Sequence, residues 1–385
     1  MNHEFHSKYP LGIKDTVTQA FSIDFLVHKQ PNPPTHWTEP SEIEDDWMRL
    51  MILSQSIATP RKEEARSGMR RDPGGYSYWL KNRSSVFLRK RLDEMNAINL
   101  LVSDTAVPPS INDFPYGSWA LNVPFTLIKP YISQEDTDFY IVDNPVKKEW
   151  VFKVPYIAPS QWKGALRSAM MQELVSDLRD KKINEEKFIE ERIRLYRLFG
   201  NEKDGTSDFL NRVHAHYSLI SSPKEGQSEQ KLQEILNSKL KDIEEAFKSE
   251  LISKGFKQGD IKGFQGNLHF YPTYFDQIGL EIINPHDRKT GAGKNPIYIE
   301  CVPEGTNGKF SLLFVPLTGV EELSDSEAKK DFGAVARGVR AMMTCYGIGA
   351  KTSSSFGIAE IGSVAATIKP EKFQKHWLTA WEESA

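Results

Sequence analysis

The order of the predicted secondary-structure elements is the feature that most constrains the fold of this chain. Apolar residues alternate along 119–127 and predict a strand, and a four-residue apolar spacing from Trp162 to Leu178 predicts a helix that Ser160 can cap. Short strands at 266–271, 280–283, 297–300 and 310–315 are followed by a helix that begins at the capping box 324–327, and then by a last strand. This order is that of the split βαβ, or ferredoxin-like, arrangement found in RNA-recognition folds, so we predict an α+β fold.

Three segments lie outside this pattern. Residues 1–115 contain proline clusters and are predicted to form an irregular, partly basic N-terminal extension. Residues 171–258 are highly charged with a helical pattern, which predicts a mostly helical insertion within a core of residues 116–366. We expect a C-terminal helix in residues 367–385.

Charge and cysteine content exclude several classes of protein. The 49 basic and 52 acidic residues give a net charge of −3, which argues against a protein that coats nucleic acid by bulk charge. The two cysteines, Cys301 and Cys345, form neither a disulfide framework nor a metal-binding pair. Because no apolar run reaches the roughly 18 residues of a membrane span, and the first residues lack a signal-peptide pattern, we expect a cytoplasmic protein without a membrane partner.

The segment 61–91 carries a strong local excess of positive charge. It holds ten basic and three acidic residues, interleaved with Tyr76, Tyr78, Trp79 and Phe87. Cations beside stackable rings suit single-stranded nucleic acid, where each stacked base contributes about 1–3 kcal/mol. The alternative is a solvated basic face with a few anchoring aromatic residues. The candidate RNA-binding residues of this segment are Arg70, Arg71 and Arg83.

A glycine-rich segment at 347–357 offers closely spaced backbone N–H groups, small hydroxyls and one lysine. A Walker loop needs glycine directly before its lysine and again five residues earlier, where this chain has Ala350 and Cys345, so we exclude ATP binding. The composition fits contacts to nucleic-acid phosphates, and the alternative is a turn without a ligand. The candidates here are Gly347, Gly349, Lys351, Thr352 and Ser353.

Asp143 ends a short apolar stretch and precedes the turn signal Asn144-Pro145, which predicts a carboxylate at the mouth of a loop. On this local pattern it is either a turn-forming residue or a functional one. No serine or cysteine nucleophile with a histidine partner can be assembled from the sequence, and no other carboxylate pairs with Asp143 in a motif.

Several of these segments together resemble the RAMP (repeat-associated mysterious protein) superfamily. Residues 140–146 read Tyr-Ile-Val-Asp-Asn-Pro-Val, and residues 154–167 read Val-Pro-Tyr-Ile-Ala-Pro-Ser-Gln-Trp-Lys-Gly-Ala-Leu-Arg. The superfamily has an Ile-Asp-x-Pro-Val element before Pro-Tyr-Ile-Pro-Gly-Ser-Ser-x-Lys-Gly-x-x-Arg. The stretches 283–295, 300–305 and 347–352 also match, in family order, over residues 118–366.

The resemblance implies a backbone-type subunit of a type III CRISPR effector complex, a cytoplasmic ribonucleoprotein of antiviral defence. It implies guide RNA as a bound component, and target RNA, other RAMP subunits and the large polymerase-domain subunit as partners. It also implies a thumb hairpin at residues 284–296. Guide contacts would come from Ser160, Lys163 and Arg167 on the first core helix, and from His286, Arg288, Lys289 and Lys294 on the thumb.

By the same resemblance, Asp143 falls on the family's catalytic aspartate. Target RNA would then be cleaved by attack of its own 2′-OH, with Asp143 orienting that hydroxyl, accepting its proton or holding Mg²⁺ or Mn²⁺. The chain departs from the family at 158–161, where a glycine is lost, and its Gly-Ala-Lys-Thr form is typical of subunits near the filament end, some of which lack the aspartate. A non-catalytic RNA-binding subunit is therefore the alternative. A guide-processing endoribonuclease is a second, although no histidine lies between His36 and His214.

Overall fold

The fold was examined in a computed structural model of the chain. The structure describes residues 8–11, 16–37, 42–58, 62–69, 72–98, 110–134, 141–201, 206–220, 229–256, 263–283, 297–316, 325–369 and 374–382.

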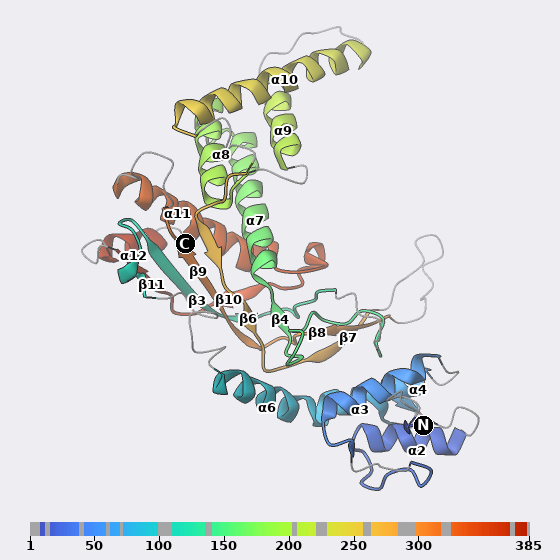
Figure 1. The fold of residues 1–385 in the computed structure, drawn as a ribbon. Coiled ribbons are helices and arrows are strands. Elements are labelled where there is room, and N and C mark those ends of the chain that lie inside the picture. The colour runs from blue at the N-terminus through green and yellow to red at the C-terminus, as the bar shows by residue number, and fades with distance from the viewer. Residues whose placement is uncertain are drawn as a thin grey trace.

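A five-stranded antiparallel sheet forms the centre of the molecule (Figure 1). Its order is β10-β3-β9-β5, and β11 pairs with the other part of the same edge of β3. Helices α7 and α11 connect the strands in the sequence order β3-α7-β5-β9-α11-β10, so the ferredoxin-like α+β prediction is confirmed. The bounds are β3 Trp119–Leu127, α7 Pro159–Arg179, β5 Leu268–Phe270, β9 Asn307–Phe314, α11 Asp325–Ala341, β10 Ala359–Ile361 and β11 Ala365–Ile368.

The core lies between this sheet and the two helices. Alternation along β3 directs Trp119 and its i+2 neighbours to one face, where Trp119 is opposite Phe314 in the register and stacks on it with ring centroids 5.1 Å apart. Trp162 of α7 contacts Phe310 of β9 from above, with centroids 4.8 Å apart. Large rings from both layers therefore fill the interface that positions α7 on the sheet.

The N-terminal segment is helical, so the prediction of irregular structure was wrong. The prolines separate short helices instead of preventing them, because each helix buries apolar residues against its neighbours. Tyr76, Trp79 and Phe87 are only 3%, 2% and 6% exposed, which makes them core residues and unavailable for stacking on bases. The elements are α2 Thr16–Leu26, α3 Asp46–Leu53, η2 Ser54–Ala58, α4 Lys62–Ser67, β1 Gly68–Met69, β2 Asp72–Pro73, α5 Gly75–Asn82, α6 Ser84–Ala97 and η3 Ile111–Asp113.

Two short antiparallel pairs lie between the sheet and the N-terminal helices (Figure 1). One pairs β4 with β6, and the other pairs β7 with β8 from Gly279 opposite Cys301 to Ile283 opposite Ile297. The segment between β7 and β8, which contains the predicted thumb, lies outside the described residues. The bounds are β4 Tyr156–Ile157, β6 Thr273–Tyr274, β7 Gly279–Ile283 and β8 Ile297–Cys301.

Helices also occupy the end of the molecule opposite the N-terminal helices (Figure 1). These are α8 Glu185–Phe199, α9 Thr206–Ile220 and α10 Glu229–Ser253. The remaining elements are the π-helical turn η4 Met342–Tyr346, the short η5 Thr352–Ser354 and α12 Gln374–Glu382. In the described part of the chain, none of the helices has the length and apolar character to cross a membrane.

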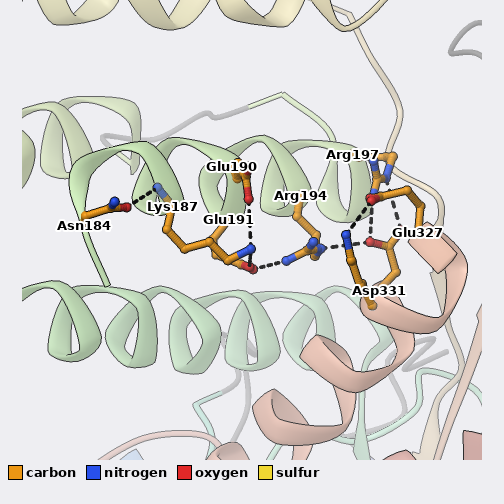
Figure 2. A network of polar contacts seen from close by, with 9 residues as sticks. Asn184, Lys187, Glu190, Glu191, Arg194, Arg197, Glu327 and Asp331 are labelled. Carbon is orange, nitrogen blue, oxygen red and sulfur yellow. Dashed lines mark hydrogen bonds and ion pairs between the residues drawn. The ribbon is translucent and has the colours of Figure 1, made fainter. Parts of the chain in front are cut away.

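A buried polar cluster joins α8 to α11 (Figure 2). Asp331 of α11 is fully buried, and its two carboxylate oxygens accept hydrogen bonds of 3.1 Å from the Nε atoms of Arg194 and Arg197 on α8. Glu191 and Glu327 pair with the same two guanidinium groups from the rim. The cluster therefore fixes the inserted helices to the core through charges that water does not screen.

We expect Asp331→Ala to lower the free energy of unfolding by about 3–5 kcal/mol, because it removes the buried carboxylate that two largely buried guanidinium groups share and leaves them only the rim carboxylates of Glu191 and Glu327. Urea unfolding followed by circular dichroism measures this loss. The control is Asp208→Ala, which removes an exposed pair with Arg212 on α9 and should cost only about 0.2–1 kcal/mol. Equal losses for the two variants would contradict a structural role of Asp331.

Candidate nucleic-acid interface

A buried carboxylate on β8 fixes the loop that contains Asp143. Glu300 is 4% exposed and accepts hydrogen bonds from the Tyr76 hydroxyl at 2.6 Å and from the backbone N–H of Val146 at 3.1 Å. It also forms an ion pair with Lys148, whose side chain is 10% exposed. The Glu300 N–H donates to the Asn144 carbonyl at 2.9 Å. Residues 144–148 are thus held by one side chain and its own backbone.

Tyr76 reaches this carboxylate from the N-terminal helices. It follows Gly75, which has a φ of +58° and lies so close to α4 that a Cβ atom would approach the Ala65 carbonyl oxygen to 2.4 Å. Glycine is therefore required where α5 begins against α4. Burial and the negative charge of Glu300 raise the pKa of Tyr76 well above its ordinary value, so Tyr76 stays protonated and donates to Glu300.

The Asp143 side chain is 49% exposed and forms ion pairs with two cations of α4. Its Oδ1 atom lies 2.6 Å from Nη2 of Arg66 and 3.3 Å from Nζ of Lys62. Nε of Arg66 also donates to the Ile141 carbonyl at 2.8 Å. Partial burial raises the pKa of Asp143, but the hydrogen bonds and charges of Arg66 and Lys62 lower it by more. The pKa of Asp143 is therefore below its ordinary value of 3.8. The carboxylate is ionised at neutral pH and accepts a proton poorly.

The surroundings of Asp143 do not fit a divalent metal ion. Mg²⁺ and Mn²⁺ need several oxygen ligands, whereas the side chains that contact this carboxylate are cations. Among the residues that the structure describes, no group of three or more histidine, cysteine, aspartate or glutamate side chains could hold a metal. We therefore assign no step to the expected metal ion.

The segment 130–133 joins the Asp143 loop to the start of α7 and to the glycine-rich loop. The Tyr131 hydroxyl donates to Oε1 of Gln161 on α7 at 2.8 Å. The Ile132 carbonyl accepts from the N–H of Ala350 at 2.7 Å, and Oγ of Ser133 accepts from the N–H of Lys147 at 2.8 Å. The Asp143 loop and the start of α7, which are close in sequence, therefore meet the glycine-rich loop from much later in the chain.

The geometry of the glycine-rich loop explains its glycines and corrects one expectation. Gly349 has a φ of +94°, and a Cβ atom there would approach the Ile132 carbonyl oxygen to 2.2 Å. The N–H groups of Gly347, Ile348 and Ala350 are bonded to carbonyl groups of the protein, so they are not the phosphate donors that the sequence suggested. The exposed side chains of this loop are those of Lys351, Ser353, Ser354 and Ser355, with Thr352 half-exposed.

The three residues of α7 that were predicted to contact guide RNA differ in their exposure. Ser160 is exposed but does not cap the helix, because α7 begins at Pro159 after an extended Ala158. Lys163 and Arg167 are half-buried along α7. Burial and the charge of Lys163 lower the pKa of His269 on β5, so this histidine is neutral at pH 7.

The sheet face opposite α7 and α11 does not offer rings for base stacking on its two central strands. β3 presents small and polar residues there, and Asn122 accepts a hydrogen bond of 2.8 Å from the Ser311 hydroxyl of β9. Thr126 donates to Asn307 at the same distance. RNA-recognition domains with this topology stack bases on aromatic residues of that face. Any RNA contact of this core is therefore expected at the loops.

The remaining predicted residues are either paired elsewhere or lie outside the described residues. Arg83 is 37% exposed and faces Asp46 within the N-terminal helices, 3.8 Å away, so its predicted RNA contact competes with an internal ion pair. Arg70 and Arg71 lie outside the described residues, as do His286, Arg288, Lys289 and Lys294 of the thumb.

Sequence reasoning missed Arg66, Tyr76 and Glu300. A signal existed for Glu300, since it interrupts the apolar strand 297–301, and a charged residue at a buried position needs partners. One of its partners, Tyr76, comes from the N-terminal helices, 224 residues earlier in the chain, and the others come from the loop at residues 144–148. No local pattern pairs such distant segments.

The fold and the site define a protein with a ferredoxin-like core whose loops converge beside a β-hairpin. A family model described as the RAMP superfamily matches residues 139–360, more than half of the chain, and the chain therefore belongs to this superfamily. No curated protein sequence matches significantly.

Two solved structures show weaker similarity. One is a chain in the cryo-EM structure of the type III-B Cmr-beta complex bound to cognate target RNA, with a TM-score of 0.40, 12% identity, and coverage of 90% of this chain and 99% of that chain. The other is Cmr6 from Pyrococcus furiosus, with a TM-score of 0.30, 16% identity, and coverage of 63% and 97%.

We expect Tyr76→Phe to loosen the Asp143 loop, because the mutation removes one donor to a buried carboxylate and should cost about 1–3 kcal/mol. Faster hydrogen exchange at residues 141–148, measured by mass spectrometry on the full chain, is the expected signature. Tyr78→Phe is the matched control, since Tyr78 lies on the same helix and is half-buried. Unchanged exchange in Tyr76→Phe would show that Glu300 does not need this contact.

Proposed function

We propose that this chain is a guide-RNA-binding backbone subunit of a type III CRISPR interference complex. The observation that carries the proposal is the convergence of the family's sequence motifs at one place. Within a chain that belongs to the RAMP superfamily, the Asp143 loop, the start of α7 and the glycine-rich loop all contact residues 130–133.

The side chains around this place suit contacts with an RNA backbone. Lys351 and Ser353 are exposed on the glycine-rich loop, and Ser160 is exposed at the start of α7, with Lys163 and Arg167 further along the helix. Lysine, arginine and serine are common phosphate and ribose contacts, and they fix position without reading sequence. A backbone subunit must hold guides of many sequences, which is the property that such contacts supply.

The partners follow from the same proposal. Target RNA would pair with the bound guide, and other RAMP subunits and the large polymerase-domain subunit would contact the remaining surface of this chain in the cytoplasm. The thumb residues 284–296 and the basic residues Arg70 and Arg71 stay proposed RNA contacts.

We expect Lys351→Ala to weaken binding of guide RNA and to lower the slope of log K against log salt by about 0.7, the value for one phosphate contact to a single strand. Fluorescence anisotropy over a salt series measures both effects. The matched control is Lys248→Ala on α10, an exposed lysine paired with Glu244 on a helix at the end of the molecule opposite the N-terminal helices. A slope that is unchanged in Lys351→Ala, or lowered equally in the control, would contradict the assignment.

Cleavage of target RNA through Asp143 is the finer hypothesis. Its half-exposed carboxylate supports access to RNA, but the pairing with Arg66 and Lys62 lowers its pKa and makes it a weak base. Of the two alternatives, we therefore propose binding without cleavage through Asp143, with the carboxylate anchoring α4 to the loop.

An assembled complex that carries Asp143→Asn should cleave bound target at the same positions and rates as the wild type, because the proposed role is structural. Gel mapping of cut positions on labelled target RNA measures this, and precursor repeat RNA in the same assay tests guide processing. Intact assembly with loss of a single cut position in Asp143→Asn would establish Asp143 as catalytic and overturn the non-catalytic proposal.

A further inference from the structure

The turn 149–153, between the Asp143 loop and α7, presents an exposed tryptophan. Trp150 is 75% exposed and Val151 is 68% exposed, more than any other large apolar side chain in the part of the chain that the structure describes. A single exposed apolar residue needs no explanation by itself. Trp150 is unusual because hydrogen bonds fix the turn that carries it and because the cation of Lys153 lies beside its ring.

The turn is closed by its own backbone and by Glu149. The Glu149 carboxylate accepts hydrogen bonds from the N–H groups of Val151 at 2.8 Å and Phe152 at 2.6 Å. The Lys153 N–H donates to the Glu149 carbonyl at 3.0 Å, and the Glu149 N–H donates to the Val154 carbonyl at 2.8 Å. Trp150 therefore projects from a fixed backbone. A ligand that binds the indole would cause little loss of conformational entropy in this turn.

Lys153 orients the indole. It adopts a left-handed conformation with a φ of +60°, and its ammonium nitrogen lies 4.7 Å from the Trp150 ring centroid and 5.1 Å from the centroid of Trp47 on α3. The cation–π contacts tie one side of the indole to the N-terminal helices. With three quarters of the side chain still exposed, a flat surface remains for a second ring.

We propose that Trp150 stacks on an unpaired base of the RNA that this chain binds, with Lys153 beside it to contact an adjoining phosphate. The inference rests on the proposed function and adds a stacking residue to it. Aromatic rings flanked by cations bind single-stranded nucleic acid without sequence preference. Charge favours RNA over a protein partner, because Lys153 lies beside the indole and the one acidic side chain of the turn 149–153, Glu149, accepts hydrogen bonds from the backbone N–H groups of Val151 and Phe152.

The experiment compares Trp150→Ala with Trp150→Tyr, which keeps an aromatic ring, and with Val151→Ala, which removes the neighbouring apolar group. The probe is a single-stranded RNA of mixed sequence that carries 2-aminopurine, titrated against the full chain. We expect Trp150→Ala to raise Kd about 5- to 100-fold with an unchanged salt slope, because stacking releases no counterions. Trp150→Tyr and Val151→Ala should bind like the wild type, and thermal unfolding verifies that each variant is folded.

The possible outcomes separate the two proposals. Wild-type affinity in Trp150→Ala, with RNA still bound by the wild-type chain, overturns the stacking role alone. Normal RNA affinity together with lost association with the other subunits in both Trp150→Ala and Val151→Ala assigns the turn to a protein contact and also overturns it. Failure of the wild-type chain to bind RNA overturns the proposed function and the stacking role together.

Discussion

The buried carboxylate of Glu300 is the interaction on which the candidate interface depends. A negative charge that is 4% exposed is stable only if every neighbour compensates it, and here a tyrosine hydroxyl, a lysine and a backbone N–H do so. These partners come from α5 and from the loop after Asp143. One charge on β8 therefore forces the N-terminal helices, the loop and the hairpin into a single arrangement, and loss of any partner is expected to disturb all three.

Several cations of the basic N-terminal segment 61–91 form ion pairs within the protein. Arg66 and Lys62 pair with Asp143, and Arg91 pairs with Asp45, so part of the positive charge is used inside the protein. Lys81 and Lys90 remain exposed on α5 and α6. The segment therefore stabilises the Asp143 loop through ion pairs and also carries exposed cations. The polar cluster around Asp331 plays an equivalent part at the other end of the core, where it fixes α8 to α11.

The division of roles between loops and sheet is physically consistent. The central strands β3 and β9 use one face for large aromatic core residues and the other for small polar pairs such as Asn122 with Ser311. Such a surface packs a core well but offers no ring for a base. Under the proposed function, stacking and phosphate contacts would be made by the loops, where Trp150 and Lys351 are exposed on turns with left-handed residues that the surrounding hydrogen bonds hold in place.

The ferredoxin-like order of strands and helices could be predicted from the sequence, because the helical spacing that includes Trp162 and the alternation along β3 are local properties. The sequence also determined the superfamily, through motifs that run in order along the chain. The tertiary structure was needed to show that Tyr76 and Trp79 are core residues and that Asp143 forms an ion pair with Arg66. It was also needed to show that Glu300 bonds to both α5 and the Asp143 loop. Burial and charge pairing between residues 77 to 224 positions apart depend on long-range packing, which no local pattern specifies.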